Sequence, residues 1–334
     1  MQKIGKQTIK FDTSPTITAS ASIVGPKESN GPLAKYFDKC LDDEFWGEET
    51  WEKAESKIIK ETVNLAISKS GISSQNIDYC FAGDLLNQCI SSSFGLRELN
   101  IPFFGVFGAC STFVESMSLG SVFIDGGAAE NVLCATSSHF CSAEKQFRFP
   151  LELGNQRPPT SQWTVTGSGS VVLSKAGNGP FITYITTGKI VDLGIKDANN
   201  MGAAMAPAAV DTLLTHFKDT GRTPSYYDVI LTGDLGHIGK DITIDMMKTH
   251  GYNINSNYND CGVLIFDKST QDTHSGGSGC ACCGTVFSGY VFQQLQEKKI
   301  KKVLLVATGA LMNSTSAQQG ETIPGIAHAI SIEL

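Results

Sequence analysis

The sequence predicts an α/β protein made of two duplicated halves, each with a mostly parallel central sheet and covering helices. Three observations predict this fold class. Helical and strand-like segments alternate along the chain, as in parallel sheets. Residues 71–85 align without gaps to residues 221–235. The 334 residues are 41% hydrophobic and 18% charged, which excludes a disordered chain and a coiled coil.

The first half alternates helices with short strands. Trp51–Ser70 has apolar residues on roughly one side, and Gly71 follows it as a helix cap. The other elements expected in this half are strands at 77–82, 103–107, 131–136 and 170–173, and a helix at 111–125. This order predicts strands that lie side by side with helices packed over them.

The second half repeats this order. We expect a helix at 207–218 and strands at 229–232, 262–266 and 302–307. A further apolar stretch, 326–330, contains His328, which we expect in the core, whereas His216 and His250 are expected on helix surfaces.

Two matched segments favour internal duplication. Residues 71–85 and 221–235 share Gly, Asp, Gly, Asp and Leu at equivalent positions, and 132–137 resembles 304–309. Chance similarity between two units of one fold is the alternative, but two matches in the same order favour duplication. A Gly-Asn-Gly-Pro turn near residue 178 marks the boundary, which predicts halves at 1–175 and 176–334.

Charge and hydropathy exclude several functions. The net charge of −7 argues against nucleic-acid binding. No secretory signal opens the sequence, and no uncharged apolar stretch of about 18 residues predicts a membrane span, so we expect membrane contact only through partners or the surface. The basic run at 297–302 could touch an anionic membrane, although a solvated helix end is the simpler interpretation.

Ten cysteines are scattered without a zinc-binding pattern, so we expect no metal site. Cys80, Cys134 and Cys261 lie in or beside apolar runs and are expected to be buried. Cys110 differs, because it follows a strand and two small residues at the start of a helix. A helix N-terminus lowers a thiol pKa, so Cys110 is either a ligand-facing nucleophile or a buried packing residue.

The duplicated halves, GACST at 108–112 and TGSGSVVL at 166–173 resemble the thiolase and ketoacyl-synthase superfamily. In that superfamily a cysteine at the start of a buried helix carries an acyl group. A closer resemblance, to the stage V sporulation protein AD family, covers nearly the whole chain. Its segments are GPKE at 25–28, GDLLNQ at 83–88, GACST at 108–112, ATSSH at 135–139, QFR at 146–148, MGAAMAPA at 201–208, NDCG at 259–262, GGSGCAC at 276–282 and VATGAL at 306–311.

This resemblance implies a thiolase-like fold that binds dipicolinic acid, pyridine-2,6-dicarboxylate, either free or as its calcium chelate. It also implies work with the membrane proteins of a channel complex, at the periphery of the forespore or spore inner membrane. No cofactor is implied. Pairing into homodimers is common in thiolase-like folds. An acidic stretch with Phe45, Trp46 and Trp51 is either an interface or a segment packed on the core.

The catalytic set of a condensing enzyme looks incomplete in this sequence. Thiolases carry a second cysteine near the C-terminus, but none follows Cys283. Asp234 stands close to where the resemblance places a catalytic histidine, and a carboxylate beside a thiol raises the thiol pKa. His274 could act as a base, but a loop histidine is the simpler interpretation. An acyltransferase that uses Cys110 as its nucleophile therefore stays an alternative.

A pocket built for a thioester could hold a small aromatic dicarboxylate instead. Backbone N–H groups at Cys110 and around Gly277 and Ser278 would bind its carboxylates, and His139 and Arg148 would add positive charge. Asp84 and Asp234 would repel a free dianion, so each either contacts a calcium chelate or orients a turn, and we favour the turn role. A structural adaptor with a vestigial pocket is the third hypothesis.

Overall fold

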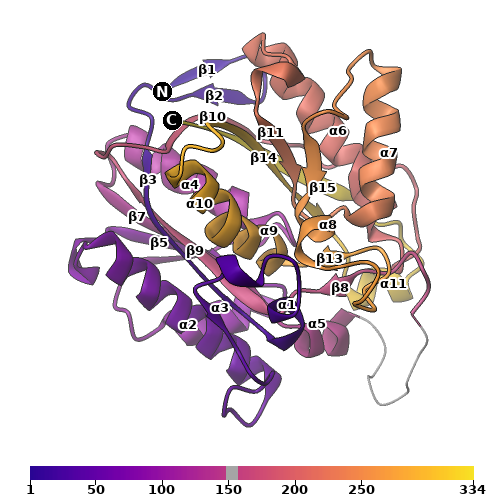
Figure 1. The fold of residues 1–334 in the computed structure, drawn as a ribbon, viewed down its shortest axis with the longest axis horizontal. Coiled ribbons are helices and arrows are strands. Elements are labelled where there is room, and N and C mark those ends of the chain that lie inside the picture. The colour runs from indigo at the N-terminus through magenta and orange to yellow at the C-terminus, as the bar shows by residue number, and fades with distance from the viewer. Residues whose placement is uncertain (148–156) are drawn as a thin grey trace.

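In the computed structural model, which describes residues 1–147 and 157–334, a long twisted sheet runs through the molecule (Figure 1). One half of its path contains β3 (Thr16–Val24), β9 (Gly167–Ser174), β7 (Asn131–Ser138), β5 (Tyr79–Gly83) and β6 (Phe103–Gly105). The other half contains β10 (Phe181–Thr186), β15 (Gly325–Glu333), β14 (Lys302–Ala310), β11 (Val229–Thr232) and β12 (Tyr258–Asp260).

The two halves of the path have the same pairing pattern. β5 lies parallel to β6 and β7, as β11 lies parallel to β12 and β14. β9 is antiparallel to β7 and β3, as β15 is antiparallel to β14 and β10. The parallel part is thus limited to the three outer strands of each half, and the boundary predicted at 175/176 falls between β9 and β10.

Short strands complete the sheets. β1 (Gln2–Ile4) and β2 (Thr8–Lys10) form a hairpin that pairs with β10, and β4 (Lys39–Cys40) pairs with β3. β8 (Trp163–Thr164) and β13 (Gly277–Ser278) form a separate parallel pair that joins the two halves. This small pair carries Ser278, whose side chain is buried.

Helices form three layers around the two halves of the sheet. α2 (Trp51–Ser70) and α3 (Ile90–Leu96) lie on the first half, and α6 (Met201–Thr220) and α7 (Gly236–Thr249) lie on the second (Figure 1). α4 (Thr112–Asp125) and α9 (Cys280–Val286) lie between the halves. The remaining α-helices are α1 (Pro26–Ser29), α5 (Phe140–Phe147), α8 (Cys261–Ile265), α10 (Phe292–Gln296) and α11 (Ser314–Gln318).

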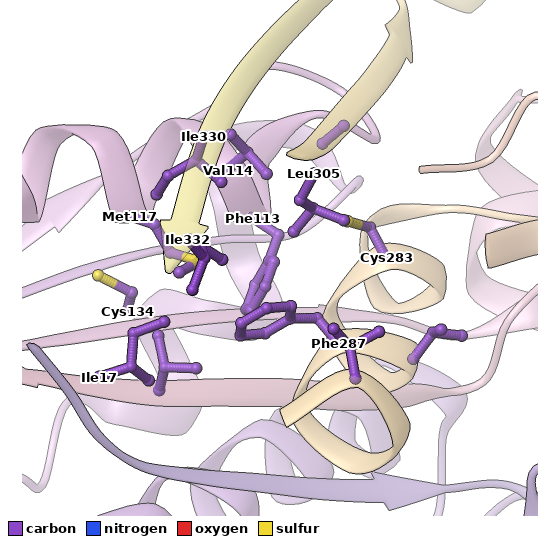
Figure 2. Packing of buried hydrophobic residues seen from close by; sticks show 14 of the residues in the cluster. Ile17, Phe113, Val114, Met117, Cys134, Cys283, Phe287, Leu305, Ile330 and Ile332 are labelled. Atoms are coloured by element: carbon purple, nitrogen blue, oxygen red, sulfur yellow. The ribbon is translucent and has the colours of Figure 1, made fainter. Parts of the chain in front are cut away.

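The central layer forms the main core. Phe113 of α4 and Phe287, which follows α9, approach each other at a ring-centroid distance of 5.8 Å. Figure 2 shows them between Ile330 and Leu305 on one side and Ile17 on the other. Every residue of α9 is buried, and its side chains are apolar or small all around, as expected for a buried helix, whereas α4 leaves Leu119 exposed.

Most predicted elements are present. α2 has the predicted bounds, because the Thr50 side chain caps its start and Gly71 ends it with a φ of 69°. Cys80 and Cys134 are buried in β5 and β7, and His328 is buried in β15, as predicted.

Three predictions are wrong. The strand expected at 262–266 is helix α8, which Asp260 caps by accepting a hydrogen bond from the Val263 N–H. A five-residue apolar run does not distinguish a strand from a buried helix turn. α6 begins at Met201 rather than at Pro207, because Asn200 caps it. His216 is fully buried rather than on the surface, hydrogen-bonded to Thr186 and Tyr227, and burial lowers its pKa to about 3.

Within the described residues, none of the helices has the length and hydrophobicity needed to cross a bilayer.

Candidate functional site

Cys110 lies in a tight turn between β6 and α4. Ala109 has a φ of 50°, and the Ser111 N–H donates to the Gly108 carbonyl, so the chain reverses over three small residues. The turn packs against the end of β14, where a Cβ on Gly309 would lie 2.4 Å from the Gly108 oxygen. Glycine is therefore required at position 309, and the Cys110 thiol is held at the junction of the two halves.

A cavity of about 40 Å³ lies beside the Cys110 thiol. It is far smaller than the roughly 300 Å³ of a typical small-molecule site, so a ring-sized ligand requires lining side chains to move. Two of these are flexible methionines. The described residues that line it are Leu85, Phe107, Ala109, Cys110, Ala143, Glu144, Phe147, Thr164, Met201, Ser278, Ala310 and Met312.

Asp234 is the buried carboxyl group behind this wall. It follows β11, and its Oδ2 accepts hydrogen bonds from the Ser278 hydroxyl at 2.9 Å and the Gly279 N–H at 3.0 Å. Its Oδ1 accepts from the Thr308 hydroxyl at 2.7 Å. Ser278 Oγ lies 4.0 Å from Cys110 Sγ, so a hydroxyl links the carboxyl group to the thiol.

The thiol is held in its protonated form. Burial raises the pKa of Cys110 well above its ordinary value, and the neighbouring Asp234 carboxylate raises it further. The sequence-based expectation that the α4 N-terminus lowers this pKa is therefore wrong, because desolvation and the carboxylate outweigh the helix dipole. The expectation that an aspartate beside the thiol raises its pKa is confirmed.

The two duplicated aspartates have different roles. Asp84 orients its turn, as predicted, by accepting hydrogen bonds from the Leu86 N–H and from Ser92. In the second half, Asp260 accepts from the Leu235 and Gly236 N–H groups instead. The sequence favoured a turn role for Asp234, but Asp260 fills that role. Asp234 instead bonds the groups around Cys110.

The structure brings together only part of the predicted ligand set. Cys110 and Ser278 line the cavity with Asp234 directly behind them, whereas Gly277 pairs with β8 and is not in the lining. His139 is also absent from the lining. Its Nε2 is 2.9 Å from the Glu44 carbonyl oxygen, its Nδ1 accepts from the Cys141 N–H, and burial lowers its pKa, which does not support a positive charge there. Arg148 lies outside the described residues.

Several cavity residues carry no signal in the sequence. Glu144 and Phe147 come from α5, Met201 begins α6, and Met312 follows β14. Met201 falls within a segment that supported the family resemblance, which is the one signal available for it. Phe147 likewise falls within the segment QFR at 146–148, whereas Glu144 and Met312 become visible only when the fold brings these elements to one place.

Two other candidate groups differ in their distance from Cys110: His274 lies in a loop, whereas Cys280 packs beside Cys110. His274 pairs with Asp272 at 2.8 Å in a loop, as the simpler interpretation predicted. Cys280, at the start of α9, donates to the Ala109 carbonyl, and burial raises its pKa. None of the described residues that line the cavity is a histidine.

The sequence matches known proteins over its full length. The family model described as stage V sporulation protein AD matches residues 5–333. Stage V sporulation protein AD of Bacillus subtilis (strain 168) is 46% identical over 333 residues, which cover 100% of this chain and 98% of that protein.

Solved structures show the same fold at low identity. 3-oxoacyl-[acyl-carrier-protein] synthase III from Aquifex aeolicus VF5 superposes with a TM-score of 0.58 at 12% identity, covering 96% of this chain and 100% of its own. A variant of OleA from Xanthomonas campestris, solved with cerulenin, gives a TM-score of 0.61 at 13% identity, with 97% and 98% covered. The fold is therefore the thiolase-like fold of condensing enzymes.

Proposed function

This chain belongs to the stage V sporulation protein AD family, and we propose that it binds dipicolinate in the cavity beside Cys110 without catalysing a condensation. We further propose that it does so at the inner membrane of the forespore or spore, together with the membrane proteins of a dipicolinate and calcium channel complex. Both the ligand and the membrane location are carried over from the family resemblance.

The observation that carries the proposal is the buried Asp234 carboxyl group beside Cys110, which the Ser278 hydroxyl links to the thiol. A condensing enzyme needs a thiolate and a neighbouring base that can take its proton. A carboxylate beside the thiol has the opposite effect, because it opposes a second negative charge. The charges beside Cys110 therefore oppose acylation of the thiol.

The cavity has complementary parts for an aromatic acid. Phe107 and Phe147 offer apolar faces to a ring, and the Ser278 hydroxyl can donate a hydrogen bond to a carboxylate. Displacement of Met201 and Met312 would open the cavity to ring size. A pocket with apolar walls and a few polar groups is the usual form of a small-molecule site.

Titration calorimetry with dipicolinate, with and without calcium, tests the proposal. We expect one ligand per chain for the native protein and at least a tenfold weaker affinity for Ala143→Met, because the added side chain fills the cavity. Cys40→Ser, which changes an exposed cysteine elsewhere, is the matched control and should bind as the native protein does. Absence of heat from the native protein under both conditions would contradict the proposal.

A second candidate, acyl transfer through Cys110, is favoured by the position of this residue at the start of a buried helix. Intact mass measurement after incubation with acyl-coenzyme A distinguishes the two. We expect no adduct, because the protonated thiol is a weak nucleophile. An acyl group on Cys110 would establish the acyltransferase, and dipicolinate uptake that survives Ala143→Met would favour the adaptor with a vestigial pocket.

A further inference from the structure

We propose that the cavity beside Cys110 takes up a proton together with its dicarboxylate ligand, and that Asp234 is the group that receives it. This inference rests on the proposed function, because it concerns the same cavity. Its basis is the position of a buried carboxyl group directly behind the wall that the ligand would contact.

Asp234 connects to the cavity through Ser278. Because the Ser278 hydroxyl donates to Asp234 at 2.9 Å and also faces Cys110, a ligand carboxylate that accepts from Ser278 takes this donor away from Asp234. A carboxylate that loses a donor and gains a neighbouring negative charge binds a proton more tightly. Burial already raises the pKa of Asp234 in the free protein, and both changes act in the same direction.

Among the residues that the structure describes, the groups that bond or flank Asp234 carry no positive charge. The described groups that bond or flank it include Cys110 before α4, Ser278 and Gly279 at β13, Thr308 of β14, Gln162 before β8, Asp260 at the end of β12, and Cys261, Cys282 and Cys283 of α8 and α9. Of these, Asp260 is a second buried carboxyl group, and burial raises its pKa to about 7.

The charge balance follows directly. A dipicolinate dianion enters the cavity, one proton comes from the solvent, and the Asp234 carboxylate receives it. Binding then strengthens as pH falls, by up to about tenfold per pH unit where one proton is linked. Calcium would supply positive charge by another route, so the test is made in metal-depleted buffers.

Calorimetry of dipicolinate binding at pH 8 in two buffers with different ionisation enthalpies counts the protons. We expect uptake of about one proton by the native protein and an affinity that increases from pH 8.5 to pH 6.5. Asp234→Asn should bind with little proton uptake and little pH dependence. Glu28→Gln, which changes a buried carboxyl group outside the cavity, is the matched control and should keep the full uptake.

Binding by the native protein without proton uptake, or undiminished uptake by Asp234→Asn, would overturn the inference and leave the proposed function intact. Absence of binding under every condition would instead count against the proposed function. If Asp234→Asn does not fold, Thr308→Val removes one donor from Asp234, and the pH window of the linkage should then move upward.

Discussion

At the residue scale, hydrogen-bond partners rather than residue types decide what each buried carboxyl group does. Asp84 and Asp234 occupy equivalent positions after β5 and β11, yet only Asp84 bonds its own turn. The sequence shows the duplication of these aspartates but not their partners, since Asp260 takes over the turn of the second half from a distant segment. The difference between a turn residue and a site residue is therefore set by tertiary contacts.

Glu28 provides a pH-dependent prediction. It is fully buried, its Oε1 accepts from the Thr166 N–H, and burial raises its pKa from 4.5 to about 8. Since the folded pKa is above the unfolded one, its contribution to stability is present below pH 4.5 and is lost as pH rises to 8. Glu28→Gln removes this loss. The free energy of unfolding of the variant, relative to that of the native protein, should therefore increase by about 1.4 kcal/mol per pH unit between pH 4.5 and pH 8.

Urea unfolding at pH 5, 6.5 and 8 measures this effect. Glu321→Gln, which changes an exposed glutamate, is the control and should show no such trend. A difference between Glu28→Gln and the native protein that stays constant with pH would show that Glu28 is ionised in the folded protein.

At the element scale, segments with local signals were predictable and segments defined by their neighbours were not. The cap at Thr50, the apolar side and Gly71 all predict α2. The apolar run after Asp260 is too short to predict a helix by its pattern, and the Asp260 cap together with packing against α9 makes it helical. The strand-to-helix turn at Cys110 was predictable, whereas the cavity walls from α5 and α6 were not, because they come from segments far apart in the sequence.

Arg222 follows α6 and connects it to the end of β15, so we expect it to stabilise the second half of the fold. Its guanidinium donates to the hydroxyls of Tyr226, Tyr227 and Ser331 and pairs with Glu333 at 2.8 Å, with both charged side chains largely buried. Removing one partner leaves the other charge buried and unpaired, so Arg222→Met should reduce the free energy of unfolding by about 3 kcal/mol.

Chemical denaturation measures this loss. Lys299→Met, which breaks an exposed ion pair with Glu297, is the control and should change stability little. Equal effects of the two substitutions would contradict a structural role for the Arg222 network.

At the scale of the whole molecule, the sheet ends at β6 with an apolar, unpaired edge. Phe103 and Phe104 are 40% and 45% exposed there. Most of the large hydrophobic side chains that the described residues expose lie on α3, β6, the turn that follows it and α4: Ile90, Phe94, Phe103, Phe104, Phe107 and Leu119. An exposed hydrophobic edge strand promotes association and is normally covered.

We propose that a second copy covers this edge through antiparallel pairing of β6 with its counterpart, because identical strands can pair about a two-fold axis. Phe103→Lys should then convert a dimer into a monomer in analytical ultracentrifugation, since it places a charge in the centre of the contact. Leu193→Lys, which changes a residue 66% exposed on another loop, should leave the dimer unchanged. A native protein that sediments as a monomer at tens of micromolar would contradict this assembly.

In a dimer, Phe107 would connect the interface to the cavity that it lines, so the same Phe103→Lys variant should also weaken dipicolinate binding.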